Sequence, residues 1–264
     1  MRSMKVILFA LLLLLAAWGR CAEIHDAALA GDLARVKAIL AADPAQLNAK
    51  GGNDKAPIHW AAQGGQLAVA KHLLAMGAAV DEPNVQKETA LVYAAEGGHL
   101  KLAELLISRG ADVNVRTELR ASPIHYALWA GRLDMVKLLV RKGADIAWER
   151  GSGFTLLHEA ANQQEPRMVE FFLGRGLAVD ARNRIGATPL HYAALHGTAE
   201  SAGLLIRRGA DVNLVSQNGW TPLGLAASRG EERLAALLLQ AGARTATADP
   251  ASGRTALHEA AARG

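Results

Sequence analysis

The sequence predicts an all-α fold, a solenoid of stacked helix-turn-helix units. Two landmarks recur at a fixed spacing along the chain, and each unit carries helix start signals followed by a glycine. The composition is that of a folded protein, with 51% hydrophobic and 20% charged residues. Because one short helix pair cannot bury its own apolar faces, the units are expected to stack.

The first 22 residues differ from the rest of the chain. The first five carry two positive charges, and the apolar run VILFALLLLLAA follows at residues 6–17. This run is shorter than the ~20 residues that span a bilayer, so we predict a secretory signal peptide in residues 1–22. Cleavage after Gly19 or after Cys21 fits the small residues found there. An uncleaved membrane anchor and acylation of Cys21 are the alternatives.

The charge balance argues against a nucleic-acid partner. The chain has a net charge of +4, but residues 1–22 hold three basic residues and no acidic one. Beyond them the basic and acidic residues nearly balance, and no run of Lys and Arg forms the basic face that nucleic-acid binding requires. Cys21 is the only cysteine, so the folded part has no disulfide framework and no cysteine metal site.

The main landmark begins with Thr, Ser or Ala. Its copies are APIHWAAQGG from Ala56, TALVYAAEGG from Thr89, SPIHYALWAG from Ser122, TLLHEAANQQ from Thr155, TPLHYAALHG from Thr188, TPLGLAASRG from Thr221 and TALHEAAARG from Thr255. The first six starts lie 33 residues apart and the last spacing is 34. Thr or Ser can cap a helix, proline fits its first position, and a glycine ends it. A second apolar-periodic helix, such as residues 99–110, then leads to a GA turn.

The landmarks divide the chain into four parts. These are a signal peptide at 1–22, an N-terminal capping repeat at 23–52, six repeats at 53–245 and a truncated C-terminal half repeat at 246–264. The capping repeat has Asp26 in the position of the histidine. The repeat from Arg150 lacks the usual turn glycine, so we expect a local bend near Pro166. Whether the half repeat acts as a cap, an assembly surface or a truncation is left open.

The T-P-L-H-x-A-A and G-A-D-V-N signatures at this period resemble the ankyrin repeat, over residues 23–264. The resemblance implies stacked helix pairs with β-turn fingers, and binding of other proteins along the inner helices and finger tips. It also implies that the histidine of the first signature is structural, hydrogen-bonding near the turn and between repeats. Helices packed ~8–10 Å apart hold such histidines too far from one another to share a metal ion.

Three kinds of position supply the candidate partner-binding residues. Just after the histidine stand aromatic residues with polar tips, Trp60, Tyr93, Tyr126 and Tyr192, which are common binding hot spots unless they pack between helices. The positions that follow the alanine pair face the inner, concave side and include Trp129, His196 and Arg229. The fingers contribute Phe154 and Trp220. Trp129 is the best single candidate, because we expect its ring to have little packing.

No catalytic arrangement is recognised. The His158-Glu159 and His258-Glu259 pairs lack the second histidine of a helix-borne zinc site, and neither a nucleophile elbow nor a phosphate-binding loop is found. We therefore predict a non-enzymatic, monomeric protein-protein interaction module, exported to the periplasm or secreted, without cofactor, metal or small-molecule substrate. The alternatives are a membrane-anchored form and a structural protein that self-associates through its uncapped C-terminal repeat face.

Overall fold

Helices joined by tight turns make up the computed structural model, which describes residues 23–246, 253 and 255–262. The predicted signal peptide lies outside the described residues. No strand is assigned within these ranges, where strand-like pairing is limited to isolated bridges such as that between Arg150 and Phe154, so the predicted all-α class is confirmed. No helix in the described ranges has the length and apolar character needed to span a bilayer. The chain divides into two units at Ala144 and Asp145, and each is described by itself.

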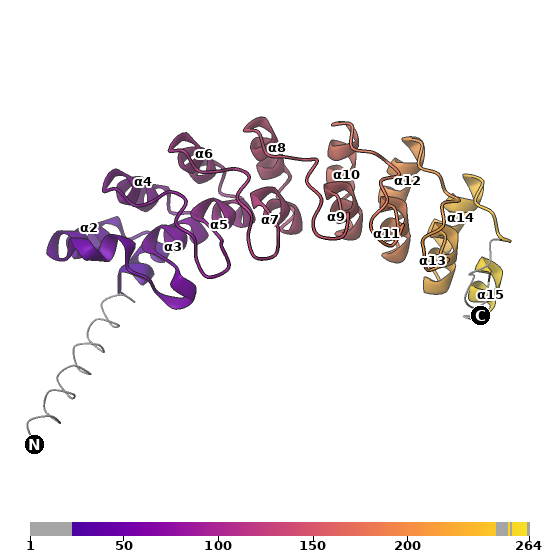
Figure 1. Cartoon of the computed structure of the whole chain (residues 1–264), viewed down its shortest axis with the longest axis horizontal. Coiled ribbons are helices and arrows are strands. Elements are labelled where there is room, and N and C mark those ends of the chain that lie inside the picture. The colour runs from indigo at the N-terminus through magenta and orange to yellow at the C-terminus, as the bar shows by residue number, and fades with distance from the viewer. Residues whose placement is uncertain (1–22, 247–252, 254, 263–264) are drawn as a thin grey trace, which may run out of the picture. The chain divides into compact units, whose positions relative to one another are not determined.

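Unit 1, which ends at Ala144, consists of two rows of short helices. The inner row contains α3 (Pro57–Gln63), α5 (Ala90–Gly97) and α7 (Pro123–Trp129), and the outer row contains α2 (Leu33–Ala42), α4 (Leu67–Ala75), α6 (Leu100–Ser108) and α8 (Leu133–Arg141). Residues 23–30 are also helical, and the short 3-10 helices η1 (Pro44–Asn48) and η2 (Gly52–Asp54) lead into the first full repeat. Successive helices of a row pack side by side (Figure 1).

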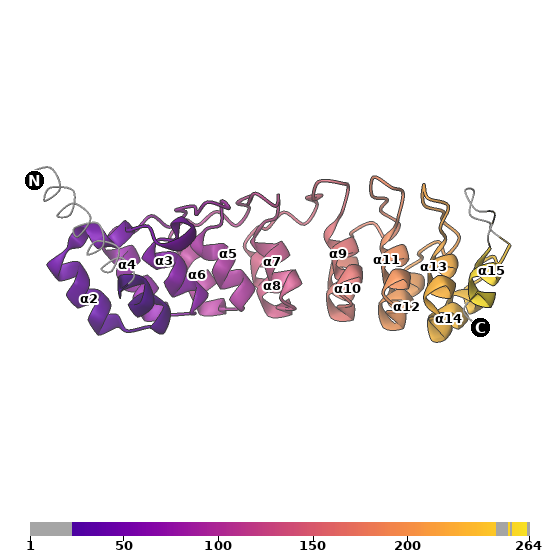
Figure 2. The ribbon, with the colours of Figure 1, turned by 90° about the horizontal axis from the view of Figure 1, so that it is seen from below.

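Unit 2, from Asp145 onward, repeats this arrangement. Its inner row contains α9 (Leu156–Asn162), α11 (Pro189–Leu195), α13 (Pro222–Arg229) and α15 (Ala256–Ala261), and its outer row contains α10 (Pro166–Leu173), α12 (Ala199–Arg207) and α14 (Glu232–Gln240). Within each unit the finger turns project to one side of the helices (Figure 2). The inner helices and the fingers beside them form the surface that we call the inner face of that unit.

Columns of identical or similar residues explain why these helices stack. At one position of every inner helix from α3 to α13 the residue is a completely buried alanine, namely Ala61, Ala94, Ala127, Ala160, Ala193 and Ala226. At one position of every outer helix from α4 to α14 the residue is a completely buried large apolar side chain, namely Leu73, Leu106, Leu139, Phe172, Leu205 and Leu238. Helices this short are not stable alone in water, whereas burial of one such large side chain contributes about 2 kcal/mol. The 33-residue spacing is therefore the spacing of the core.

The finger turns are linked by backbone hydrogen bonds between neighbours. The Glu118 amide donates to the Gln86 carbonyl at 2.9 Å in unit 1, and the Gln217 amide donates to the Ile185 carbonyl at 2.8 Å in unit 2. One position of each turn has a positive φ, which is held by Gly153, Gly186 and Gly219 in unit 2 but by Asp54, Lys87 and Arg120 in unit 1. A side chain at positive φ is strained, so at this turn position unit 1 carries a conformational cost that unit 2 avoids.

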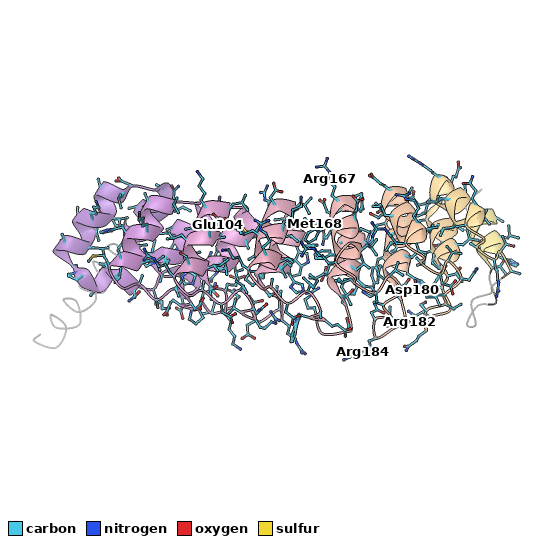
Figure 3. The ribbon with its side chains drawn as sticks, turned by 90° about the horizontal axis from the view of Figure 1, so that it is seen from above. Glu104, Arg167, Met168, Asp180, Arg182 and Arg184 are labelled. Carbon is cyan, nitrogen blue, oxygen red and sulfur yellow. The ribbon has the colours of Figure 1, made fainter. Side chains whose placement is uncertain are left out.

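The GADVN signature ties each repeat to the next. The Asp211 amide donates to the Asp180 carboxylate at 3.1 Å, and the equivalent Asp112 amide donates to the Asp81 carboxylate at 3.0 Å. Figure 3 shows Asp180 on the finger side of unit 2, together with Arg182 and Arg184. Burial raises the pKa of both the Asp81 and Asp180 carboxyl groups, while the amide that each accepts partly opposes this rise.

The repeat that begins near Arg150 departs from the pattern in one backbone detail. The inner helices of several other repeats end at a left-handed glycine such as Gly65, Gly131 or Gly230, whereas Gln164 adopts this conformation after α9, with φ of 59°. Pro166 is the first residue of α10, where its missing amide hydrogen costs no helical hydrogen bond. The irregular sequence therefore keeps the regular helix pair.

Candidate functional site

Where the histidine column holds a histidine, as in α9 and α11, the ring joins the inner helix to the turn before it and to the finger of the next repeat. His158 Nδ1 accepts the Thr155 amide at 3.2 Å, and its Nε2 donates to the Ala187 carbonyl at 3.1 Å. His191 repeats both contacts with Thr188 and Trp220, each at 3.1 Å. The two rings are buried, and burial lowers the pKa of each imidazole to about 4. The expectation that these histidines are structural is confirmed.

The described residues contain no group of three or more His, Cys, Asp or Glu side chains placed to hold a metal ion. In the histidine column, both nitrogens of His158 and His191 already contact protein atoms. These two rings therefore have no remaining lone pair for a metal or a substrate proton.

The column that follows the histidine connects the inner helix to a finger residue nine positions earlier. Asn183 Nδ2 donates to the Tyr192 hydroxyl at 2.9 Å, and the Tyr126 hydroxyl oxygen lies 3.3 Å from Thr117 Oγ1. Asn84 Nδ2 makes the same contact with Tyr93 at 3.0 Å. In the repeat of α9 the column holds Glu159, whose buried carboxylate contacts Arg150 at 3.0 Å. Finger and helix are joined by a polar contact in all four repeats.

In unit 1 the predicted aromatic residues surround a lysine. The Lys55 ammonium lies 4.8 Å from the Trp60 ring centre and 4.3 Å from the Tyr93 ring centre, in cation-π geometry. It also donates to Gln63 Oε1 at 3.2 Å. Burial lowers the pKa of the Lys55 amine, and the carboxylates of Glu88 and Glu96 partly offset this effect. Three segments of unit 1 therefore meet at one desolvated cation.

The two tyrosines of unit 1 have little free surface. Tyr93 and Tyr126 are each 8% exposed, and both hydroxyls donate to the carboxylate of Glu88. Burial is the main cause that raises the pKa of both phenols, to about 12 for Tyr126. Their place in a partner-binding surface stays a prediction, and little of either side chain is open to a partner in this structure.

The expectation that the Trp129 ring lacks packing partners is wrong. Trp129 is half-buried at the end of α7 and packs against a buried cluster of Val92, Ala121 and Tyr126. Its ring centre lies 5.2 Å from that of Tyr126. Its remaining exposed part is what a partner could contact.

In unit 2 the predicted aromatic residues form a cluster beside a pocket. Phe154 stacks on His158 with ring centres 5.1 Å apart, and meets Tyr192 edge-on at 4.8 Å. A pocket of about 180 Å³ follows on the other side of Tyr192, between the fingers and the inner helices α11 and α13. Trp220 and Leu225 line this pocket. Phe154, Tyr192 and Trp220 thus share one surface. They come from different repeats and, for Tyr192, from a different column of the repeat.

The two predicted polar candidates of unit 2 are exposed at the ends of the inner helices. His196 directly follows α11, and one of its ring nitrogens lies 2.9 Å from Asn162 Oδ1. Arg229 is the last residue of α13. His196 comes four residues after Tyr192, and Arg229 four residues after Leu225, so each lies on the same helix face as a pocket residue. Sequence reasoning selected both residues but missed the pocket between their helices.

One histidine in the capping repeat has a role that its position in the sequence conceals. The repeat pattern places Asp26 in the histidine column, but His25 makes the corresponding contact, its Nε2 lying 2.9 Å from the Ala49 carbonyl oxygen. Asp26 is exposed, and burial lowers the pKa of the His25 imidazole. The irregular connection through η1 shifts the register by one residue, which a strict 33-residue alignment does not reveal.

The paired helices, finger turns and histidine contacts define a helical-repeat scaffold protein. The family model described as Ankyrin repeats (3 copies) matches residues 24–117, 124–216 and 196–264. The chain therefore belongs to the ankyrin-repeat family, whose members are generally protein-protein interaction modules. It is similar to the human ASB11 ankyrin repeat domain, a crystal structure with 30% identity and a TM-score of 0.74. The match covers 83% of this chain and 96% of that one. Comparison with curated proteins gives no match.

Proposed function

We propose that this chain is a non-catalytic module that binds a partner protein through the inner faces and finger tips of its repeats. The observation that carries this proposal is the partly exposed aromatic surface of unit 2, where Phe154, Tyr192 and Trp220 lie beside an open pocket. Aromatic side chains in such pockets supply much of the energy of protein association. Such binding does not require breaking the hydrogen bonds that the histidines and the fingers make within the protein.

The proposal includes the expected location and organisation of the chain. We infer export directed by residues 1–22, with a capping repeat, six repeats and a C-terminal half repeat forming the mature protein, in the periplasm or in a secreted form. The intact mass of the protein recovered from its source tests this inference. A mass that lacks about 20 N-terminal residues supports export with cleavage, whereas the full-length mass contradicts it.

Affinity capture with matched variants tests the binding function. The immobilised wild type is compared with Trp220→Ala on the inner face of unit 2 and Trp129→Ala on that of unit 1. The control variants Leu100→Ala in α6 and Met76→Ala directly after α4 remove exposed side chains, 38% and 48% exposed, from the outer row. We expect a partner that the wild type and both controls retain and that at least one tryptophan variant loses. Equal retention by all five proteins would contradict binding through the inner faces.

Self-association is a second candidate function, favoured by the exposed apolar residues near the last helices. Leu239 of α14 is 46% exposed and Leu257 of α15 is 64% exposed. Sedimentation over a range of protein concentrations separates the two functions. A mass that rises with concentration in the wild type, but not in Leu257→Ser, supports self-association. A constant monomer mass leaves binding of a different protein as the function.

A further inference from the structure

The pocket of unit 2 exists because one repeat departs from two columns at once. In the preceding repeat the columns hold His191 and Tyr192, and the tyrosine ring reaches across to Asn183 of its finger. The next repeat has glycine at 224 and leucine at 225. The Trp220 ring lies over Gly224, and a Cβ added to this glycine would be 3.3 Å from the nearest ring carbon of Trp220. The space that a tyrosine would occupy at 225 stays open.

The finger residue that would hold such a tyrosine is present but engaged elsewhere. Ser216 stands nine residues before Leu225, as Thr117 stands nine residues before Tyr126. Its hydroxyl accepts the Trp220 amide at 3.2 Å, and no side chain of the described residues crosses from α13 to it. The repeat therefore keeps its finger turn while losing the ring that closes the surface between finger and helix.

The lining of the pocket is mainly apolar and partly open to solvent. Its apolar residues are Ile185, Ala187, Tyr192, Leu195, Trp220 and Leu225. Ile185, at the finger, is 42% exposed. A volume of 180 Å³ is below the ~300–1,000 Å³ of ordinary small-molecule sites, but it exceeds the ~150 Å³ cavity that holds a benzene molecule. The pocket thus has the size of one aromatic or branched aliphatic side chain.

A positive charge stands one helical turn from the pocket. Arg229 follows Leu225 by four residues on α13, and is exposed. Among the residues described for unit 2, none forms an ion pair or hydrogen bond with its guanidinium. Side chains four apart on a helix lie about 5–6 Å apart, and alternate residues of an extended chain lie about 6–7 Å apart. An extended segment can therefore place one side chain in the pocket and the next but one against Arg229.

We propose that this pocket receives one apolar or aromatic side chain of an extended partner segment that carries Asp or Glu two positions away. The proposal rests on the proposed protein-binding function and names the chemistry of the partner. The side chain fills the place of the missing tyrosine ring, between Trp220 and Leu225. The carboxylate pairs with Arg229, and the exposed amide of Asn218 at the mouth of the pocket is placed to hydrogen-bond the backbone of the segment.

The test begins with a library of random linear peptides displayed on phage and selected on the full chain. We expect the selected peptides to share an aromatic or aliphatic residue with Asp or Glu two positions before or after it. Synthetic labelled copies are then titrated against purified variants. Replacement of the apolar residue by serine, or of the acidic residue by lysine, should each weaken binding at least tenfold.

The variants fill the pocket or reverse the charge beside it. Leu225→Tyr restores the side chain that three other repeats carry in this column and should weaken binding at least tenfold, while circular dichroism and urea unfolding show an intact fold. Ile185→Ser removes an exposed wall of the pocket without touching the core. Arg229→Glu should reverse the preference, so that the peptide with lysine binds better than the peptide with the acid. Arg233→Glu, on the exposed side of α14, is the matched control and should change nothing.

Each outcome bears on the proposal. Peptides whose affinity is the same for the wild type, Leu225→Tyr and Arg229→Glu would overturn the pocket, while leaving binding elsewhere on the inner face intact. Selection of no common motif would also overturn it, because an open peptide site selects its ligand from such a library. The capture experiment with Trp129→Ala and Trp220→Ala then decides separately whether the protein binds a folded partner.

Discussion

The buried histidines of unit 2 make its stability dependent on pH. Burial lowers the pKa of His158 and of His191 to about 4, whereas an imidazole in the unfolded chain titrates near 6.5. Between these two values the unfolded state binds more protons than the folded state. The stability that depends on the neutral rings is therefore fully present above about pH 6.5 and is lost as the pH falls towards 4.

The size of the effect follows from the two pKa values. Lowering the pH from 7 to 5 favours the unfolded state by about 2 kcal/mol for each histidine whose pKa is near 4 when folded and near 6.5 when unfolded. The two rings together remove about 4 kcal/mol, which is a large share of the 5–15 kcal/mol typical of a folded domain. Most unfolded carboxylates stay ionised over this interval, so their contribution is small.

Urea unfolding at pH 7 and at pH 5, followed by circular dichroism, measures this loss. His191→Gln keeps an acceptor and a donor on the side chain but does not titrate, so it should remove about 2 kcal/mol of the pH dependence. The double variant with His158→Gln should remove both contributions. The dependence that remains then comes from unit 1, where burial also lowers the pKa of His25 and His59. A wild type equally stable at both pH values, or a His191→Gln variant with the full dependence, would refute the reasoning.

Three further substitutions test the scaffold by chemical unfolding. Lys87→Gly removes the strain of a side chain at a φ of 59°. After the entropy cost of glycine is subtracted, it should raise the free energy of unfolding by about 0.5 kcal/mol. The control Lys101→Gly, inside α6, should lower the free energy of unfolding by about 1 kcal/mol. Arg150→Ala takes the guanidinium away from the buried carboxylate of Glu159 and should cost about 3 kcal/mol; adding Glu159→Leu should recover most of it. Asn213→Ala removes the acceptor of a backbone amide 31 residues away and should cost about 1–2 kcal/mol.

The fold and the role of the histidines could be predicted because they depend on the repeat period. A residue that recurs every 33 positions meets the same neighbours each time, so one family of contacts explains the whole column. The same reasoning predicts that Gly224 is tolerated in the histidine column, and α13 does form there, with the Thr221 hydroxyl accepting the Gly224 amide at 3.0 Å. Columns identify what every repeat shares.

Features that arise in a single repeat were harder to predict. The Trp129 ring packs onto Tyr126 and a buried cluster that includes Val92 and Ala121, and this contact depends on how several side chains meet in three dimensions, not on the column. His25 replaces the expected histidine because the capping repeat shifts its register. The sequence did carry a signal for the pocket, because Gly224 and Leu225 both depart from their columns. This departure shows that a histidine ring and a tyrosine ring are missing from the repeat, but it does not show whether another side chain fills the space they would occupy.

One column shows how a uniform scaffold acquires a particular surface. At the position after the histidine, Tyr192 closes the surface between finger and helix with a hydroxyl contact, Glu159 closes it with a buried ion pair, and Leu225 leaves it open. All three repeats keep the same helices, because the stacking energy comes from the alanine and leucine columns on the other faces. The same pair of helices therefore forms whether the position holds Tyr, Glu or Leu. We therefore expect a binding pocket in a repeat that keeps its finger turn but has no aromatic ring or ion pair at the position after the histidine. In unit 2 this is the repeat of α13.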